Sequence, residues 1–572
     1  MLHLWARRRA AQRTPIDIPS TVPTTEVIFL IMRRMRAPLI FVIVTFSFCT
    51  AGMMFIPGVD SQGNPHRLSI FDAFYQMTIT LTTVGFTEAP YPFSIPQRMW
   101  MSLSIFLLVI SWAYAIGVFL SLVQSSAFQS AVAAQQFRRQ VRRLVEPFVI
   151  VGGYGNAGKL VGVDLDEHYR RFVVIDHRQE SVQSVVSEEL SFDVPAVQGD
   201  CAEPAVLGMA GLGSPHCEGV LALTSDDDTN LAVVMAASLL RPDLPVLGRC
   251  AHRRTRNRME HFAPGSAINA DDRFGDYLAQ SIHQPVSYQL LRWLMDNDQE
   301  RLLPARRDLA DRRWMVCAEG EFGETIVSDL AAIGLNVELV DPAGDEPDVS
   351  GSVAFVAGTD NDTVNIAMAE HTRHINPDAY LVVRQQTNAK KILLETLQIE
   401  SVYIATEVIA REVLARILTP EFWSFVEYVL TRDDQWATEV RDHLEQRCGQ
   451  RTPERDILTL SEERAPAIAD WLRRGNTLTL GTLMLQPDDR DTTLPLAALV
   501  LFRDGEPQFM PPEDTPLALD DQVLIVGKPA GLSEVREVCF YPSTVEYLAT
   551  GHEVPLTWAW SKLTTRRRSR TK

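Results

Sequence analysis

A short stretch in the N-terminal part of the chain could bind a cation through backbone oxygens alone. It reads Thr-Thr-Val-Gly-Phe-Thr-Glu and lies in a loop between two hydrophobic segments. Carbonyl oxygens can replace the hydration shell of a monovalent ion where small and threonine side chains let the carbonyls align. Non-helical backbone is tolerated at membrane depth only where it lines a cavity or is buried in protein. The candidate filter residues are Thr82, Thr83, Val84, Gly85, Phe86, Thr87 and Glu88.

A second stretch could bind the phosphates of a nucleotide. Gly153, Gly155 and Gly158 follow an expected strand at 148–151, and Asp176 ends the next expected strand. In this pattern the glycines permit a tight turn, a close approach of pyrophosphate and close helix packing. The helix N-terminus stabilises phosphate charge, and Asp176 can accept bonds from a ribose diol, which favours NAD(H) or an adenine nucleotide over NADP. A Rossmann fold with a purely structural turn is the alternative.

Two charge-free segments would position the filter. Residues 37–56 and 99–123 are each long enough to cross a hydrocarbon core of about 30 Å. Residues 1–36 form a basic tail that ends with Arg33, Arg34 and Arg36 just before the first segment. Four more arginines follow the second segment, at 138, 139, 142 and 143. By the positive-inside rule both ends are therefore cytoplasmic and the loop faces outward. Within the loop, 69–81 has the length of a short helix that could dip into the bilayer.

The charge distribution divides the chain into two unlike parts. Residues 1–145 contain 13 arginines, no lysine and 5 acidic residues, whereas the remainder carries a net charge of −26. A basic, apolar N-terminal quarter joined to an acidic body indicates a membrane anchor with a cytoplasmic body. The acidic body argues against nucleic acid as a partner. The 7 cysteines form no CxxC pair, which fits a reducing compartment and gives no disulfide framework or metal site.

The order helix, short helix, TTVG-aromatic, helix over about 37–125 resembles the two-span potassium-channel pore. The resemblance implies K⁺ as the permeant ion, a plasma-membrane location and, with one pore loop per chain, a homotetramer. Phe86 replaces the commoner tyrosine, and Glu88 keeps the usual carboxylate. Thr87 stands where the family places glycine, and a β-branched residue is disfavoured at positive φ. A less selective cation channel is therefore the alternative.

The second span and the segment after it would carry gating. Ser111 and Gly117 are candidate hinges, although close helix packing explains Gly117 equally well. Residues 124–146 are polar and alanine-containing, and we expect them to form a helical linker.

Further strand and helix alternations follow the glycine turn and predict a parallel sheet. Gly199-Asp200, the run from Thr224 to Asn230, and Arg249 make residues 147–290 resemble the RCK domain (regulator of potassium conductance, also TrkA-N or KTN), with the domain ending near 303. The resemblance implies that Asp200 and Cys201 lie beside the adenine or ribose and Arg249 near the ligand. The predicted nucleotide-binding residues are Gly153, Tyr154, Gly155, Asn156, Ala157, Gly158, Asp176, His177, Asp200, Cys201, Thr224 and Arg249.

The chain then repeats this pattern. Gly320 and Gly323 match the second and third glycines of the turn, and Ala318 stands in place of the first. Asp341 takes the place of Asp176, and Thr359 heads a second threonine–asparagine run. The offset is 165 residues at the glycines but 135 at the threonines, so about 30 residues are missing from the second copy. We expect a second, shortened Rossmann lobe with a degraded nucleotide site.

The remaining segments complete the predicted organisation. Residues 284–303 would join the two copies as a swapped or crossover helix. The second copy covers 311–420. Residues 421–563 resemble the C-terminal lobe of RCK (TrkA-C) domains, and 564–572 form a basic tail. The predicted fold class is multidomain: an α-helical two-span pore domain, α/β Rossmann-like RCK domains and a small α+β lobe.

The predicted function is a nucleotide-gated potassium channel with eight RCK domains in the tetramer, and not an enzyme. The second hypothesis is the less selective channel. The third is a membrane-anchored NAD-dependent oxidoreductase, but no His, Lys or Tyr is placed beside the turn for hydride chemistry. A soluble transporter regulator is excluded by the pore in the same chain. The direction of gating, calcium regulation and ligand binding by the second copy stay open.

Overall fold

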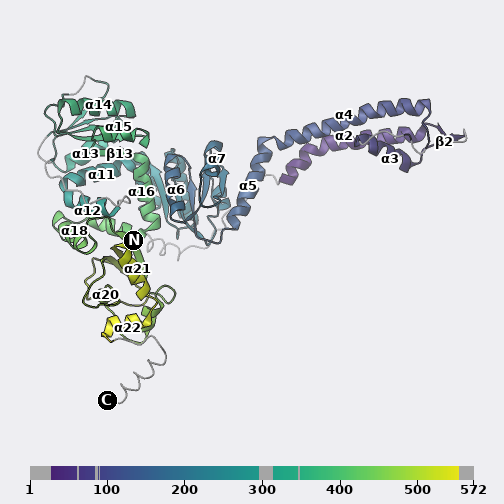
Figure 1. Cartoon of the computed structure of the whole chain (residues 1–572). Coiled ribbons are helices and arrows are strands. Elements are labelled where there is room, and N and C mark those ends of the chain that lie inside the picture. The colour runs from purple at the N-terminus through teal and green to yellow at the C-terminus, as the bar shows by residue number, and fades with distance from the viewer. Residues whose placement is uncertain are drawn as a thin grey trace, which may run out of the picture.

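The computed structural model describes residues 27–60, 64–83, 88, 91–295, 309, 313–344 and 348–552. A helical hairpin projects from a larger body built of three lobes (Figure 1). We refer to them as the first lobe (148–295), the second lobe (313–429) and the C-terminal lobe (434–552). This arrangement confirms the predicted multidomain fold class.

The hairpin consists of α2 (Val27–Phe55) and α4 (Ile95–Val123). Both are long and apolar enough to cross a membrane, α2 over Arg33–Phe55. Their outer faces expose large apolar side chains such as Phe106, which a core helix of a soluble protein would bury. The two helices are joined by a hydrogen bond of 3.0 Å from Trp100 Nε1 to the Cys49 carbonyl.

The outer end of the hairpin holds the short helix α3 (Ile70–Leu81), where the sequence predicts one at 69–81. Ser69 caps its first turn by accepting a hydrogen bond from the Asp72 N–H. Buried Ala73 and Met77 pack α3 against the hairpin. The two-residue strands β1 (Gly58–Val59) and β2 (Pro65–His66) complete this end.

Helix α5 (Ser126–Arg142) connects the hairpin to the first lobe. The expected helical linker is present, but it does not prolong α4. Ser125 has extended backbone, with φ −71° and ψ 135°, so α5 runs across the direction of α4 (Figure 1). The apolar side chains of Phe137 and Val141 are buried in the core of the first lobe.

The first lobe has a six-stranded parallel sheet in the order β5-β4-β3-β6-β7-β8, a doubly wound arrangement. Its central strands are runs of valine and isoleucine because helices cover both faces. The strands are β3 (Phe148–Gly152), β4 (Arg171–Asp176), β5 (Ala196–Gln198), β6 (Cys217–Ala222), β7 (Val246–Cys250) and β8 (Ala267–Asn269). The helices are α6 (Asn156–Glu167), α7 (Gln179–Ser187), α8 (Pro204–Met209), α9 (Asp227–Leu240), α10 (Arg253–Phe262), α11 (Ala270–His283) and α12 (Pro285–Met295).

The second lobe repeats this fold with a five-stranded parallel sheet in the order β10-β9-β11-β12-β13. Between β10 and β11 the described residues contain no strand or helix, where the first lobe has α7, β5 and α8. This shorter connection accounts for the change of offset along the repeat. The strands are β9 (Trp314–Cys317), β10 (Val337–Val340), β11 (Ala354–Ala357), β12 (Tyr380–Gln385) and β13 (Ser401–Ile404). The helices are α13 (Gly320–Ala332), α14 (Asp362–Ile375), η1 (Asn388–Lys390), α15 (Lys391–Thr396), α16 (Ala405–Leu418) and α17 (Pro420–Val429).

The two lobes exchange equivalent helices. Helix α11 of the first lobe packs on α13 of the second, while α16 packs on α6 of the first. One continuous apolar core joins both sheets. At the crossing, the buried Glu412 carboxylate accepts a hydrogen bond of 2.9 Å from Arg273 Nε and pairs with Arg416. The arrangement is that of a pseudo-symmetric dimer formed within one chain.

The C-terminal lobe has a four-stranded antiparallel sheet in the order β14-β17-β15-β16. Buried Asp521 accepts two hydrogen bonds from Arg503, of 2.9 and 2.7 Å. The strands are β14 (Glu454–Thr459), β15 (Leu496–Arg503), β16 (Glu506–Phe509) and β17 (Gln522–Gly527). The helices are α18 (Asp434–Cys448), α19 (Pro466–Arg473), α20 (Leu480–Leu483), α21 (Pro529–Val538) and α22 (Pro542–Thr550).

A carboxyl group at the α11–α13 contact makes the packing of the two lobes sensitive to pH. Asp329 lies against Gly275, and its Oδ2 atom is buried without a hydrogen-bond partner in the described structure. Burial, with the nearby Asp276 charge, raises the pKa of Asp329 to about 6. The folded state therefore binds a proton that the unfolded state releases, so this contact is strongest below the ordinary aspartate pKa. It weakens as the pH rises through about 6.

We therefore expect Asp329→Asn to raise the thermal stability of the full chain at pH 8 and to leave it unchanged near pH 4. Melting curves of detergent-solubilised protein at the two pH values test this expectation. An equal shift at both pH values would contradict a titrating Asp329.

Candidate functional site

The edge of the predicted filter is described at Thr82, Thr83 and Glu88, whereas Val84, Gly85, Phe86 and Thr87 lie outside the described residues. Thr82 ends α3, and its hydroxyl donates a 2.8 Å hydrogen bond to the carbonyl of Thr78. Thr83 has φ 56°, a left-handed conformation that costs a β-branched residue about 1–3 kcal/mol. The chain therefore leaves α3 through a strained residue, and such strain is concentrated at functional sites.

Glu88, the last residue of the candidate filter, is bonded to the start of α4 and the residues before it. Its carboxylate accepts two hydrogen bonds from Arg98, of 2.8 and 3.1 Å, and one of 3.0 Å from the Phe93 N–H. The Arg98 guanidinium, followed by the Phe93 N–H, holds the pKa of Glu88 below its usual value. The carboxylate predicted to belong to the filter thus also fixes the loop behind it.

The two candidate hinges lie in one unbroken helix, α4. Ser111 is buried, and its hydroxyl donates a 2.9 Å hydrogen bond to the Leu108 carbonyl. At Gly117 a Cβ atom would meet no described atom within 4 Å. Packing within one chain therefore does not account for this glycine.

The glycine turn between β3 and α6 has the geometry of a phosphate-binding loop. Gly153 has φ +94°, and a Cβ there would lie 2.6 Å from the Thr224 nitrogen. At Gly158 a Cβ would lie 2.1 Å from the Gly153 oxygen. At Gly155, by contrast, a Cβ would meet only the end of the Arg178 side chain, at 3.5 Å. The first and third glycines are required by packing, and the middle one leaves the backbone open to a ligand at the N-terminus of α6.

Asp176 lies at the carboxyl end of β4, next to this turn. Its buried carboxylate accepts hydrogen bonds from the Tyr154 N–H at 2.7 Å and the Arg178 N–H at 2.8 Å. The Tyr154 side chain points into the core, where its hydroxyl donates to Glu188 and burial raises its pKa. Tyr154 therefore contributes its backbone to the turn and no ring to a ligand. His177, the neighbour of Asp176, is exposed.

The remaining predicted residues divide between the surface and the core. Asp200 is exposed, and its carboxylate accepts a hydrogen bond from the Ala202 N–H. Cys201 is buried behind β3 in contact with Gly152, and burial raises its pKa to about 12. A thiol in this environment is inert. Asn156 and Ala157 form the first turn of α6.

Thr224 and Asn230 form a clasp that positions Arg249. The Asn230 carboxamide oxygen accepts hydrogen bonds from the Thr224 N–H and hydroxyl, at 3.0 and 2.7 Å. Its Nδ2 atom donates to the Arg249 carbonyl at 2.9 Å. The Arg249 side chain is half-buried, and no hydrogen bond or ion pair is made by its guanidinium in the described part of the chain.

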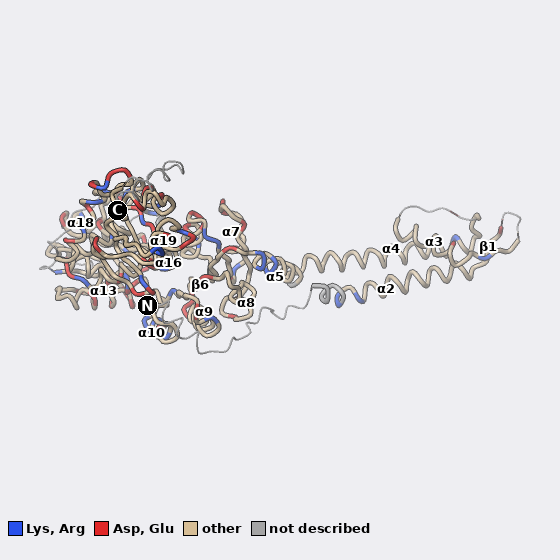
Figure 2. The backbone as a smooth tube through the Cα atoms, turned by 90° about the horizontal axis from the view of Figure 1, so that it is seen from below, with Lys and Arg blue, Asp and Glu red and all other residues tan. Residues whose placement is uncertain are grey.

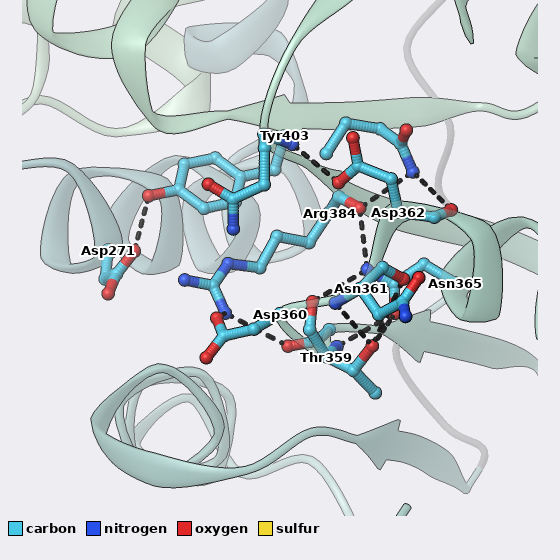
Figure 3. A network of polar contacts seen from close by, with 11 residues as sticks. Asp271, Thr359, Asp360, Asn361, Asp362, Asn365, Arg384 and Tyr403 are labelled. Carbon is cyan, nitrogen blue, oxygen red and sulfur yellow. Dashed lines mark hydrogen bonds and ion pairs between the residues drawn. The ribbon is translucent and has the colours of Figure 1, made fainter.

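The second lobe has the same clasp, with a different arginine environment. Asn365 bonds Thr359 and the Arg384 carbonyl as Asn230 does in the first lobe. Figure 3 shows the Arg384 side chain between Tyr403 and Asp360. It pairs with Asp360 at 2.6 Å and lies over the Phe322 ring, 4.7 Å from the ring centroid. This arginine is therefore neutralised and packed by residues of its own lobe.

Phe322 closes the site of the second lobe. A Cβ atom at Gly358 would lie 2.4 Å from the Phe322 ring, so the ring lies tightly against the end of β11. The ring also stacks on Tyr403, with centroids 5.4 Å apart. In the first lobe the repeat places Ala157 where Phe322 stands and Ser225 where Asp360 stands. The first lobe thus has a small residue and a charged arginine where the second has an aromatic ring and an ion pair.

Sequence reasoning missed two features of this region. Arg178 was not predicted, although the end of its side chain lies beside Gly155 and its Nε atom is 3.7 Å from Asp176. Its position two residues after the strand-ending acid was the available signal. Phe322 was also overlooked, although it is the bulky residue within the second glycine pattern.

Comparison with known proteins supports the assignment of the first lobe. Residues 149–269 match the model of the TrkA-N domain, so the chain carries this domain, as the sequence predicts. The chain is 21% identical over 189 residues to potassium channel protein 1 of Methanocaldococcus jannaschii, a match that covers 33% of this chain and 55% of that protein. Probable potassium channel protein 2 of the same organism is 21% identical over 193 residues, covering 33% and 54%. The match spans about half the length of these relatives.

Among solved structures, the chain is similar to the GsuK channel bound to NAD, with 12% identity and a TM-score of 0.41, covering 90% of this chain and 100% of that one. GsuK bound to ADP has 15% identity and a TM-score of 0.38, covering 69% and 100%. The TrkA-N domain of the inner membrane protein ybaL from Escherichia coli has 18% identity and a TM-score of 0.21, covering 23% and 92%.

Proposed function

We propose that this chain is the subunit of a potassium channel whose opening is controlled by a nucleotide bound to the first lobe. The observation that carries the proposal is the contrast between the lobes. Arg249 is half-buried with no ion pair in the described structure, whereas its counterpart Arg384 pairs with Asp360. The curated relatives named potassium channel proteins support the permeant ion. The candidate filter on an apolar hairpin supports a pore in the same chain.

The proposed ligand is NAD(H) or another adenine nucleotide. Its phosphates would lie against Gly155 at the N-terminus of α6, within reach of the Arg178 side chain. Arg249 would supply further positive charge, because guanidinium groups bind phosphate with two parallel hydrogen bonds. Asp176 would accept from the ribose hydroxyls, since a carboxylate has lone pairs beyond the two used by backbone N–H groups. The ligand acts here as a regulator, and no chemical change of it is proposed.

Gating would follow from a change in the relation of the lobes. Four chains would place eight lobes around one pore, and α5 would transmit a displacement of the first lobe to the end of α4. A nucleotide can shift the pore only by its difference in affinity for the open and closed arrangements. The reciprocal exchange of α11 and α16 ties the second lobe to the first, so the pair would move as a unit.

Asp176→Ala should weaken binding of the adenine nucleotide, and Asp176→Asn should weaken it less. Asparagine keeps one acceptor oxygen for the turn, whereas alanine leaves the Tyr154 and Arg178 N–H groups without their partner. Titration calorimetry on the purified chain measures both effects. Unchanged binding by both variants would contradict the ribose assignment.

The second candidate is a less selective cation channel, favoured by Thr87 in a position where glycine is expected. Reversal potentials of the reconstituted protein in opposed K⁺ and Na⁺ gradients distinguish the two candidates. A reversal near the K⁺ equilibrium potential supports potassium selectivity, and a reversal near zero supports the less selective channel. The third candidate is an NAD-dependent oxidoreductase. Measured turnover of NADH in the presence of an electron acceptor would support it.

A further inference from the structure

A group of exposed arginines surrounds the inner end of the hairpin. We call it the arginine collar, and it comprises Arg33, Arg34 and Arg36 of α2 with Arg139, Arg142 and Arg143 at the end of α5. Figure 2 shows these blue segments at the start of α2 and on α5, whereas most of the remaining hairpin is uncharged. Helices α2 and α5 contact each other, so both groups belong to the same end of the hairpin.

Within the described residues, no carboxylate neutralises the charge of the collar. Neither α2 nor α5 contains an acidic residue. No collar arginine forms an ion pair with a described residue. The ion pairs on either side of α5 along the chain involve Arg98 and Glu146. The next carboxylate along the chain, Glu146, is paired with Arg171. Six guanidinium groups therefore face outward together.

The orientation of α5 decides what these groups would meet. Its apolar face, with Phe137 and Val141, is buried against the first lobe, which leaves the arginine face exposed. It runs across the direction of α4 directly after the span ends (Figure 1). If α2 and α4 cross a bilayer, as the proposed function requires, α5 lies along the membrane surface. A helix so placed presents its arginines at the level of lipid headgroups.

We propose that the arginine collar binds the phosphates of anionic phospholipids and thereby holds α5 at the membrane surface. Guanidinium groups bind phosphate with two parallel hydrogen bonds, and each basic residue near an anionic bilayer strengthens attachment about fivefold. When lipid fixes α5 at the membrane surface, a displacement of the first lobe is transmitted to the end of α4 and does not merely move α5. The response of the pore to nucleotide therefore depends on anionic lipid.

Measuring the lipid that co-purifies with the full chain tests this binding directly and does not depend on channel activity. The chain is extracted from membranes containing phosphatidylglycerol and phosphatidylcholine, and the retained lipids are measured by mass spectrometry. We expect selective retention of phosphatidylglycerol. The triple variants R33Q/R34Q/R36Q and R139Q/R142Q/R143Q should each reduce it by about a hundredfold, because three fivefold effects multiply. The control R254Q/R258Q removes exposed arginines of α10 and should retain phosphatidylglycerol as the original chain does.

Equal retention of the two lipids, or unchanged retention by both triple variants, would overturn the proposal. Release of phosphatidylglycerol by inorganic phosphate at matched ionic strength would also overturn it, because the collar would then be a site for free anions. The two proposals fail separately. Selective lipid retention with no nucleotide-dependent K⁺ flux contradicts only the channel function, and flux that is equal with and without phosphatidylglycerol contradicts the lipid dependence of gating.

Discussion

Replacing Arg249 with glutamine is expected to weaken nucleotide binding to the full chain by about tenfold to a hundredfold. The range corresponds to the loss of one hydrogen-bonded charge contact with a phosphate. Glutamine fills much of the same volume, and the Arg249 guanidinium has no hydrogen bond or ion pair in the described structure. The fold should therefore be preserved. Titration calorimetry with NAD and with ADP measures the change.

The repeat supplies a matched control at the equivalent position. Arg384→Gln removes the same side chain from the second lobe, where Arg384 pairs with Asp360 and packs on Phe322. Binding should remain within about twofold of the original chain. Equal losses from the two variants would contradict the assignment of the ligand to the first lobe. So would full binding by Arg249→Gln.

Replacing Glu412 with glutamine is expected to destabilise the paired lobes by about 3–5 kcal/mol. Glu412 is 2% exposed and is the shared partner of Arg273 and Arg416. Burial lowers the pKa of Arg416 even beside this carboxylate, because a buried environment disfavours a charged guanidinium. Removing one member of a buried ion pair leaves the other charge uncompensated. Urea unfolding of the detergent-solubilised chain, followed by tryptophan fluorescence, measures the loss.

An exposed ion pair provides the comparison for this effect. Asp470 of α19 and Arg474, the residue that caps its C-terminus, form a surface pair one turn apart. Asp470→Asn should change stability by no more than about 1 kcal/mol, as is usual for such pairs. A Glu412→Gln effect as small as this would contradict a structural role for the buried triad at the crossing of the lobes.

The broad organisation could be predicted because it depends on strong local patterns. Charge-free segments long enough to cross a bilayer have few other interpretations, and α3 forms where Ser69 and Asp72 provide a capping signal. The repeat revealed the second sheet, and the change of its offset revealed a missing element. The glycines at 153 and 158 were predictable because close backbone contacts at those positions exclude any side chain.

The rest depended on contacts between distant segments, which no local pattern records. The break at Ser125 sets the direction of α5, yet serine is equally compatible with a continuous helix. The burial of Tyr154 and Cys201 follows from how α6 and β3 pack, so residues within a ligand-binding motif are partly core residues. Predicting that Phe322 closes the corresponding region of the second lobe would have required knowing that Arg384 lies over its ring. The exchange of α11 and α16 is likewise a property of the assembled lobes.

Single-channel recording of the reconstituted chain tests directly whether a nucleotide controls the pore. NAD, NADH, ADP and ATP are added in turn to the side that faces the lobes. We expect K⁺ currents whose open probability changes with at least one of these nucleotides. Arg249→Gln should shift the effective nucleotide concentration by the same factor as the loss of binding, while Arg384→Gln should not. K⁺ currents that are unaffected by every nucleotide, or an identical response from the two arginine variants, would contradict control of the pore by a nucleotide in the first lobe.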